Sequence, residues 1–166
     1  MVYSGGNEHE KGVGILLDTE HSKSLHGYWP VNERILVVKL SGKPFDIYVI
    51  QIYAPTSEHS DDEIEKFYEK LDNVKGNLNT QDVKIVMVDF NAKVGNEKIE
   101  DTVGPHGIGD INARGERLVE WCGEHDYSIT NTWFRNYPRS FWTWMSPGDR
   151  VRTKSILLSP QNAFEM

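Results

Sequence analysis

The 166-residue sequence contains one cysteine and no long apolar run. A single cysteine excludes an internal disulfide framework and fits a reducing compartment. No apolar stretch approaches the length of a bilayer span, and residues 1–11 lack the apolar segment of a signal peptide. We therefore expect an intracellular protein, nuclear or cytoplasmic, that does not interact with membranes. The six histidines are scattered without the spacing of metal ligands, so the sequence predicts no zinc site.

Positive charge is scarce as well, because 18 Lys and Arg residues stand against 25 Asp and Glu residues, for a net charge of −7. This balance argues against binding nucleic acid by bulk electrostatics. Residues 133–154 are the exception, since they combine five basic residues with six aromatic ones. Such a mixture suits a surface that contacts phosphates and stacks on bases, and we select Arg135, Arg139 and Trp142 as candidate contacts. The alternative is a strand pair with packed aromatics and solvated arginines, and both interpretations stay open.

Strand-forming patterns predominate along the chain. Strands are expected over residues 13–17, 34–40, 46–53, 84–89, 127–130 and 141–144, with a further one over 151–158. A short turn joins the second and third of these strands, which predicts an antiparallel hairpin. Residues 1–11 are expected to be a loop or a ragged start and residues 21–32 a connection.

Two helices complete the pattern. Residues 60–63 form a capping box, and the apolar stripe that follows predicts a helix ending near Gly76. This helix connects the third strand to the 84–89 strand as a crossover. A second helix is expected over about residues 115–124, with Asn112 near its start. The side chains expected to point inward are Ile64, Phe67, Leu71 and Val74 in the first helix and Leu118, Val119 and Cys122 in the second.

The 84–89 strand ends in a carboxylate. As a short apolar run, it is expected to be buried on both faces. Side chains alternate along a strand, so Asp89 and Asn91 are expected to emerge on the same side. A carboxylate beside an amide can hold a metal-bound water and a phosphate. Alternatively, the two residues merely begin the turn that Gly95 closes.

Tyr53 occupies a comparable place at the end of the 46–53 strand, because Pro55 has no N–H to continue the ladder. The alternative for Tyr53 is an ordinary half-buried strand tyrosine. A long glycine-punctuated loop over residues 104–112 comes later, and a loop of this length in a compact domain is usually functional or disordered.

Taken in order, these segments resemble the endonuclease/exonuclease/phosphatase superfamily. More narrowly, they are similar to the apurinic-endonuclease-like domain of non-LTR retrotransposons of the LINE and RTE types. The resemblance extends over about residues 12–158. It rests on Ile52-Tyr53-Ala54-Pro55-Thr56, an amphipathic helix, Val88-Asp89-Phe90-Asn91, and the loop His106-Gly107-Ile108-Gly109 with Asn112.

The resemblance implies a four-layered α/β sandwich of the DNase I-like type, present over residues 1–166 as a single partial domain truncated at both ends. It also implies Mg²⁺-dependent (or Mn²⁺-dependent) cleavage of DNA by a metal-activated water. Asp89 would be a catalytic and metal-binding residue, and Asn91 would hold both Asp89 and the phosphate. Tyr53 would donate its hydroxyl to a phosphate oxygen, and Asn112 would lie near the phosphate. We expect the protein to be a monomer with DNA as its substrate.

The chain departs from the family's pattern at four places. One is the segment over residues 152–158, which lacks the acid that relatives carry there. The early segment that carries the family's metal-binding Glu has no counterpart here, nor has the closing Ser-Asp-His segment. Val88 replaces the glycine that usually precedes Asp89. An endonuclease, a catalytically incomplete relic and a nucleic-acid-binding module therefore stay open as hypotheses. A phosphatase of the same superfamily agrees less well with residues 104–134.

Overall fold

The computed structural model describes residues 1–5, 12–56, 59–89, 92–135, 144–145, 152–153 and 156–161. The chain forms two compact units, Met1–Met87 and Val88–Met166, which are described separately. The boundary between them falls inside strand β6 (Val83–Asp89), so the expectation of a single domain stays a prediction.

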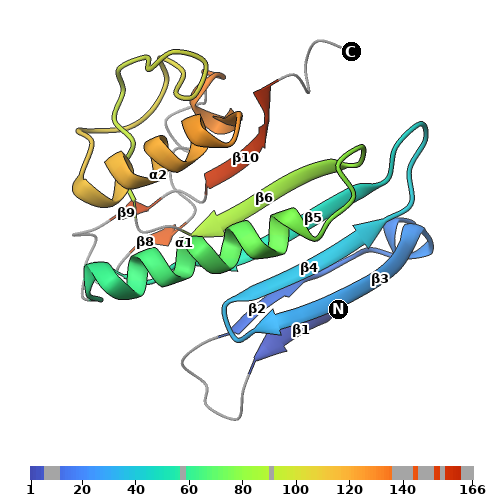
Figure 1. The fold of residues 1–166 in the computed structure, drawn as a ribbon. Helices are drawn as coiled ribbons and strands as arrows, with labels where there is room; N and C mark the ends of the chain where they lie inside the picture. The colour runs from blue at the N-terminus through green and yellow to red at the C-terminus, as the bar shows by residue number, and fades with distance from the viewer. Residues whose placement is uncertain are drawn as a thin grey trace. The chain divides into compact units, whose positions relative to one another are not determined.

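The N-terminal unit contains most of the strands (Figure 1). Its elements are β1 (Val2–Gly5), β2 (Gly12–Ile15), the 3-10 helix η1 (His21–Ser24), β3 (Leu25–Asn32), β4 (Ile35–Leu40), β5 (Ile47–Tyr53), α1 (Asp61–Gly76) and the greater part of β6. Strands β3, β4, β5 and β6 follow one another in the sheet, and β1 and β2 form a separate hairpin. The predicted hairpin is confirmed, since β4 pairs antiparallel with β5 from Ile35↔Ile52 to Leu40↔Ile47.

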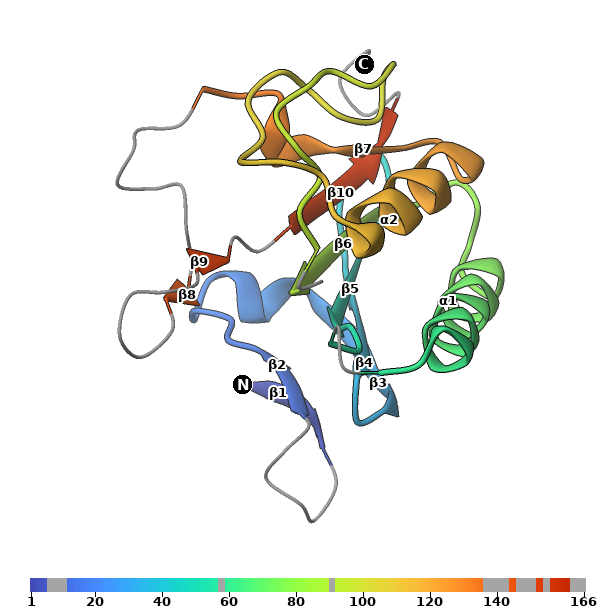
Figure 2. The same ribbon diagram turned by 90° about the vertical axis from the view of Figure 1, so that its left-hand side faces the viewer.

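Strands β4 and β5 are covered on both faces, which explains why nearly all of their residues are apolar and none is fully exposed. Leu36 and Val38 of β4 pack with Val2 and Val13 of the β1–β2 hairpin into one buried cluster. Because side chains alternate, the intervening residues of each strand point to the opposite face. Figure 2 shows the hairpin and α1 on opposite sides of this part of the sheet. The N-terminal unit thus has three layers: hairpin, sheet and helix.

Two predictions for the N-terminal unit are wrong. Residues 1–11 are not simply a loop, because Val2–Gly5 forms β1, with Val2 and Ser4 buried and the residues between them exposed. The connection expected over residues 21–32 contains the eight-residue strand β3. Pro30 obscured it in the sequence, but β3 is an edge strand, where a missing N–H breaks no ladder.

Helix α1 begins as predicted. The Ser60 side chain accepts a hydrogen bond from the Glu63 amide, while the Glu63 carboxylate accepts one from the Ser60 amide, at 3.0 Å. Of the predicted stripe, Ile64, Phe67 and Leu71 are buried, whereas Val74 is only half-buried. Tyr68 is an additional buried residue of this helix.

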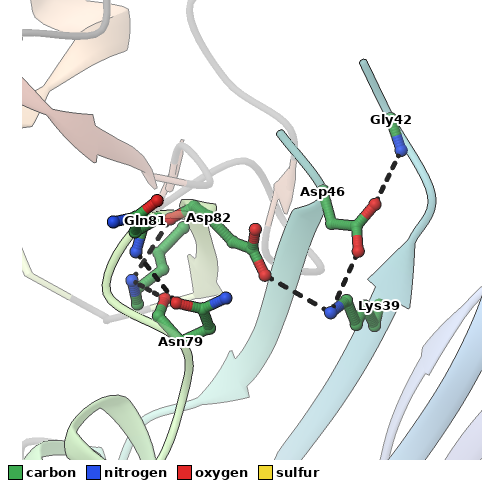
Figure 3. Close-up of polar contacts among 7 residues, drawn as sticks. Lys39, Gly42, Asp46, Asn79, Gln81 and Asp82 are labelled. Carbon is green, nitrogen blue, oxygen red and sulfur yellow. Dashed lines mark hydrogen bonds and ion pairs between the residues drawn. The ribbon is translucent and has the colours of Figure 1, made fainter. Parts of the chain in front are cut away.

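An ion-pair cluster joins the start of β5 to the segment before β6 (Figure 3). The ammonium of Lys39 lies 3.0 Å from the Asp46 carboxylate and 3.3 Å from the Asp82 carboxylate. The hydrogen bond to Asp46 raises the pKa of Lys39. In turn, the backbone amide of Gly42 and then the Lys39 ammonium lower the pKa of Asp46. These charges stabilise the end of the sheet that lies away from Tyr53.

The C-terminal unit contains the second helix and short strands. Its elements are α2 (Ala113–Glu124), β7 (Tyr127–Ile129), the 3-10 helix η2 (Thr130–Thr132), β8 (Trp144–Met145), β9 (Arg152–Thr153) and β10 (Ile156–Pro160). Strand β10 pairs antiparallel with β7, and β8 with β9. The single strand expected over 151–158 is therefore wrong, because two strands with different partners lie there. Of the strand expected over 141–144, only residue 144 is among the described residues.

Two burial predictions for the second half of the chain need correction. Strand β6 is not buried on both faces, since Val86 and Val88 are buried but Met87 is 40% exposed. In α2, Leu118 and Cys122 are buried as expected, whereas Val119 is only half-buried. Trp121, with no exposed surface, is the large core residue that the sequence analysis did not select.

Candidate functional site

Tyr53 is the last residue of β5 and is fixed by its neighbours in the N-terminal unit. It packs, half-buried, against the cluster of Val2, Val13, Leu36 and Val38. Its backbone amide donates to the Arg34 carbonyl at 2.9 Å, one step beyond the β4–β5 ladder. The Arg34 guanidinium lies over the ring, with its carbon 5.3 Å from the ring centroid. Within the part of the chain that the structure describes, the Tyr53 hydroxyl makes no hydrogen bond.

Arg34 and His59 are functional candidates that the sequence analysis missed. Arg34 Nη2 lies 3.2 Å from His59 Nε2, and His59 Nδ1 lies close to both the backbone amide and the hydroxyl of Thr56. The predicted hairpin carried a usable signal, because the register that pairs residue 35 with residue 52 also places Arg34 opposite Tyr53. The position of His59 depends on the segment before α1 and had no such signal.

Asp89 is the last residue of β6, as predicted, and its side chain lies outside the described residues. The same holds for the whole of Asn91, Arg139 and Trp142. The roles assigned to these four side chains stay predictions. Arg135 is described and is exposed, next to Phe134, which is 57% exposed.

Asn112 caps helix α2 and also holds the segment that follows β6. Its side-chain oxygen accepts hydrogen bonds from the Gly115 amide at 2.8 Å and from the Lys93 amide at 3.0 Å. The backbone amide of Asn112 donates a hydrogen bond to the Lys93 carbonyl at 3.1 Å. This double connection requires Gly115, since a Cβ there would lie 1.8 Å from the Lys93 carbonyl oxygen. The NH₂ group is thus the part of the Asn112 side chain suited to a phosphate.

The glycine-punctuated loop is ordered by contacts within the C-terminal unit. Gly104 donates its amide to the Thr132 hydroxyl at 2.7 Å, and His106 donates to the Thr132 carbonyl at 2.9 Å. Gly107 approaches so closely that a Cβ would lie 1.7 Å from the Gly95 carbonyl oxygen. Glycine is therefore required at 107 for close packing of the loop against the segment after β6.

The described residues do not complete a metal site. No three or more of their His, Cys, Asp and Glu side chains are grouped closely enough to hold an ion. An open groove of about 600 Å³ lies in the N-terminal unit, but none of the predicted site residues lines it. Its apolar lining comes from Trp29, Val31, Val37, Val74 and Leu78. None of the described helices is long and apolar enough to span a membrane.

Comparison with known proteins gives two kinds of relative. Craniofacial development protein 2 of Bos taurus is 37% identical over 141 residues, which cover 85% of this chain and 24% of that protein. The Tragulus javanicus protein of the same name is 34% identical over 141 residues, covering 85% of this chain and 25% of that protein. This chain spans about a quarter of the length of these relatives. No protein-family model matches it.

Among solved structures, the endonuclease domain of TRAS1, a telomere-specific non-LTR retrotransposon, matches with a TM-score of 0.61. The match covers 90% of this chain and 60% of that domain, at 17% sequence identity. The chain thus has the α/β fold of that endonuclease domain and is similar in sequence to about a quarter of craniofacial development protein 2. The resemblance seen in the sequence and the predicted DNase I-like α/β class are both confirmed.

Proposed function

We propose that this chain acts on the phosphodiester backbone of DNA as an endonuclease domain that depends on Mg²⁺, or alternatively on Mn²⁺. The observation that carries the proposal is the fold shared with a retrotransposon endonuclease domain, combined with Tyr53 and Asp89 as the last residues of β5 and β6. These two strands are neighbours in the sheet order and are connected by α1.

Each residue has a chemical task in this proposal. The Tyr53 hydroxyl would donate a hydrogen bond to a non-bridging phosphate oxygen. Asp89, ionised at neutral pH, would orient and deprotonate the attacking water, and Asn91 would steady both groups. Asn112 would donate from its NH₂ group, because its oxygen is already bound by two amides.

The metal is the part of the proposal that experiment must decide. Bound Mg²⁺ would neutralise charge on the phosphate, and Asp89 is the residue proposed to hold it. The described residues supply no complete ligand set for it. The protein's own groups would bind and orient the phosphate, and Asp89 would orient and deprotonate the water.

The test is nicking of supercoiled plasmid by the purified chain, with Mg²⁺ and with EDTA. We expect Mg²⁺-dependent nicking that falls by about 10²-fold or more in Asp89→Ala and by less in Tyr53→Phe. If the wild-type chain nicks no faster than Asp89→Ala, this chain does not catalyse cleavage. Tyr53→Phe is a clean variant because it keeps the ring that Arg34 contacts.

A second function, binding of nucleic acid without turnover, is favoured by the exposed side chains of Phe134 and Arg135. Their neighbour Trp133 has the Lys98 ammonium 5.3 Å from its ring centroid, which adds a second positive charge to this region. Duplex affinity should then fall with salt, and Arg135→Ala should reduce the salt slope by about one. Affinity that does not respond to salt would contradict this function.

A further inference from the structure

The Arg34 guanidinium is half-buried and has no acidic partner within the part of the chain that the structure describes. Among the described residues, no carboxylate lies within ion-pair distance of it. Its closest polar contact in the backbone is long, from Nη1 to the Tyr53 carbonyl at 3.5 Å. Hydrogen bonds from the Ser60 amide and hydroxyl lower the pKa of Glu63, and the charge of Arg34 adds a smaller lowering. The Glu63 carboxylate is thus already bound by Ser60. A charged group that is partly withdrawn from water without a counter-ion is suited to binding an anion.

Two N–H donors contact the His59 ring, which can accept a hydrogen bond from only one of them. The Thr56 amide points at Nδ1 at 3.2 Å, and Arg34 Nη2 points at Nε2 at 3.2 Å. A neutral imidazole has only one nitrogen that can accept, and a protonated one has none. If Nδ1 accepts from Thr56, Nε2 carries the proton and cannot accept from Arg34. Of the two donors, the Arg34 guanidinium is the one that can rotate toward another acceptor, because the Thr56 amide belongs to the backbone.

We propose that Arg34 is a phosphate-binding residue, and that its ligand is a phosphodiester oxygen of the nucleic-acid backbone. The inference rests on the proposed function, because it adds a residue to the same end of β5. The contact with the Tyr53 ring holds the guanidinium beside the residue already proposed to donate to the phosphate. The fork of N–H donors matches two phosphate oxygens in a way that a lysine ammonium does not. The Thr56 hydroxyl, 3.0 Å from His59 Nδ1, lies in the same cluster.

The first measurement is duplex DNA affinity of the full chain as a function of salt, by fluorescence anisotropy. One lost phosphate contact should lower the slope of log K against log[salt] by about 0.9 in Arg34→Met. Lys23→Met is the matched control, since it removes one exposed charge from η1. Helix η1 is hydrogen-bonded to Ser41, just beyond the end of β4 that lies away from Arg34. We expect the slope of Lys23→Met to equal that of the wild type. An unchanged slope in Arg34→Met would overturn the proposal.

The second measurement needs no DNA and is made on the wild-type chain, with a variant used only to assign the signal. Inorganic phosphate is titrated into the wild-type chain while the arginine Nε–H signals are followed by NMR, with Arg34→Lys used for assignment. A saturable shift at Arg34 supports the anion site, whereas equal shifts at all arginines, or none, overturn it. If the wild type does not bind duplex at all, the proposed function fails, and this titration alone decides the role of Arg34.

Discussion

Two glycines of helix α2 should respond in opposite ways to the same substitution. Gly115 and Gly123 both lie within Ala113–Glu124, and alanine is the better helix former by about 1 kcal/mol. A Cβ at Gly123 would meet no atom within 4 Å, but a Cβ at Gly115 would lie 1.8 Å from the Lys93 carbonyl oxygen. Gly123→Ala should therefore stabilise the protein, whereas Gly115→Ala should destabilise it.

The magnitude for Gly115→Ala follows from the overlap. A real Cβ does not approach a heavy atom closer than 3.0 Å, so the carbonyl or the helix must move by at least 1.2 Å, the difference between 3.0 and 1.8 Å. Overpacking of this kind costs about 1–3 kcal/mol. The move also strains the bonds between Asn112 and Lys93, each worth about 1 kcal/mol. We expect a loss of about 2–4 kcal/mol for Gly115→Ala and, since Gly123 lies close to the helix end, a gain of about 0.5–1 kcal/mol for Gly123→Ala.

Urea unfolding followed by far-ultraviolet circular dichroism measures both changes as shifts of the midpoint at constant slope. The matched pair removes the effect of helix propensity, because each variant makes the same chemical change in the same helix. If Gly115→Ala stays within about 0.5 kcal/mol of the wild type, the size expected of a neutral surface change, the close approach to Lys93 does not exist as described.

Three other results are expected. Asn112→Ala should lower stability by about 1–2 kcal/mol through the lost cap, whereas exposed Asn96→Ala should not, in the same urea assay. Asn112→Asp keeps an accepting oxygen and should retain stability while weakening duplex binding in an anisotropy titration. Asp46→Asn should lower the urea midpoint at pH 6. Because Asp46 has a lowered folded pKa, its contribution is fully present above the unfolded pKa of about 3.9 and is lost as the pH falls through the folded pKa. Wild type and variant should therefore converge as the pH is lowered.

The parts of the fold that the sequence predicted are those with strong local signals. The β4–β5 hairpin and α1 have matched strands, a short turn and a complete capping box within a few residues. Strand β3 has no such signal, because its place at the sheet edge, which makes Pro30 tolerable, is a property of the folded sheet. The division of residues 151–158 into two strands likewise follows from pairing with β8 and β7.

The candidate site residues likewise divide into those that have a local signal in the sequence and those that do not. Strand ends predicted Tyr53 and Asp89, since a strand's last residue is visible from the apolar run that precedes it. The second acceptor role of Asn112, toward Lys93, spans 19 residues and depends on how the intervening loop closes. His59 likewise meets Arg34 from 25 residues away. Long-range contacts of polar side chains have no period in the sequence, so no pattern predicts them.

The structural roles of these residues decide how their functions can be tested. The Tyr53 hydroxyl makes no hydrogen bond within the described residues, so Tyr53→Phe removes only the proposed phosphate donor and keeps the ring under Arg34. Asn112→Ala, in contrast, removes a proposed phosphate donor together with two bonds that fix Lys93 and α2. A loss of activity in Asn112→Ala would follow from either cause. Only the difference between Asn112→Asp and Asn112→Ala, measured in stability and in binding together, separates the helix cap from the phosphate contact.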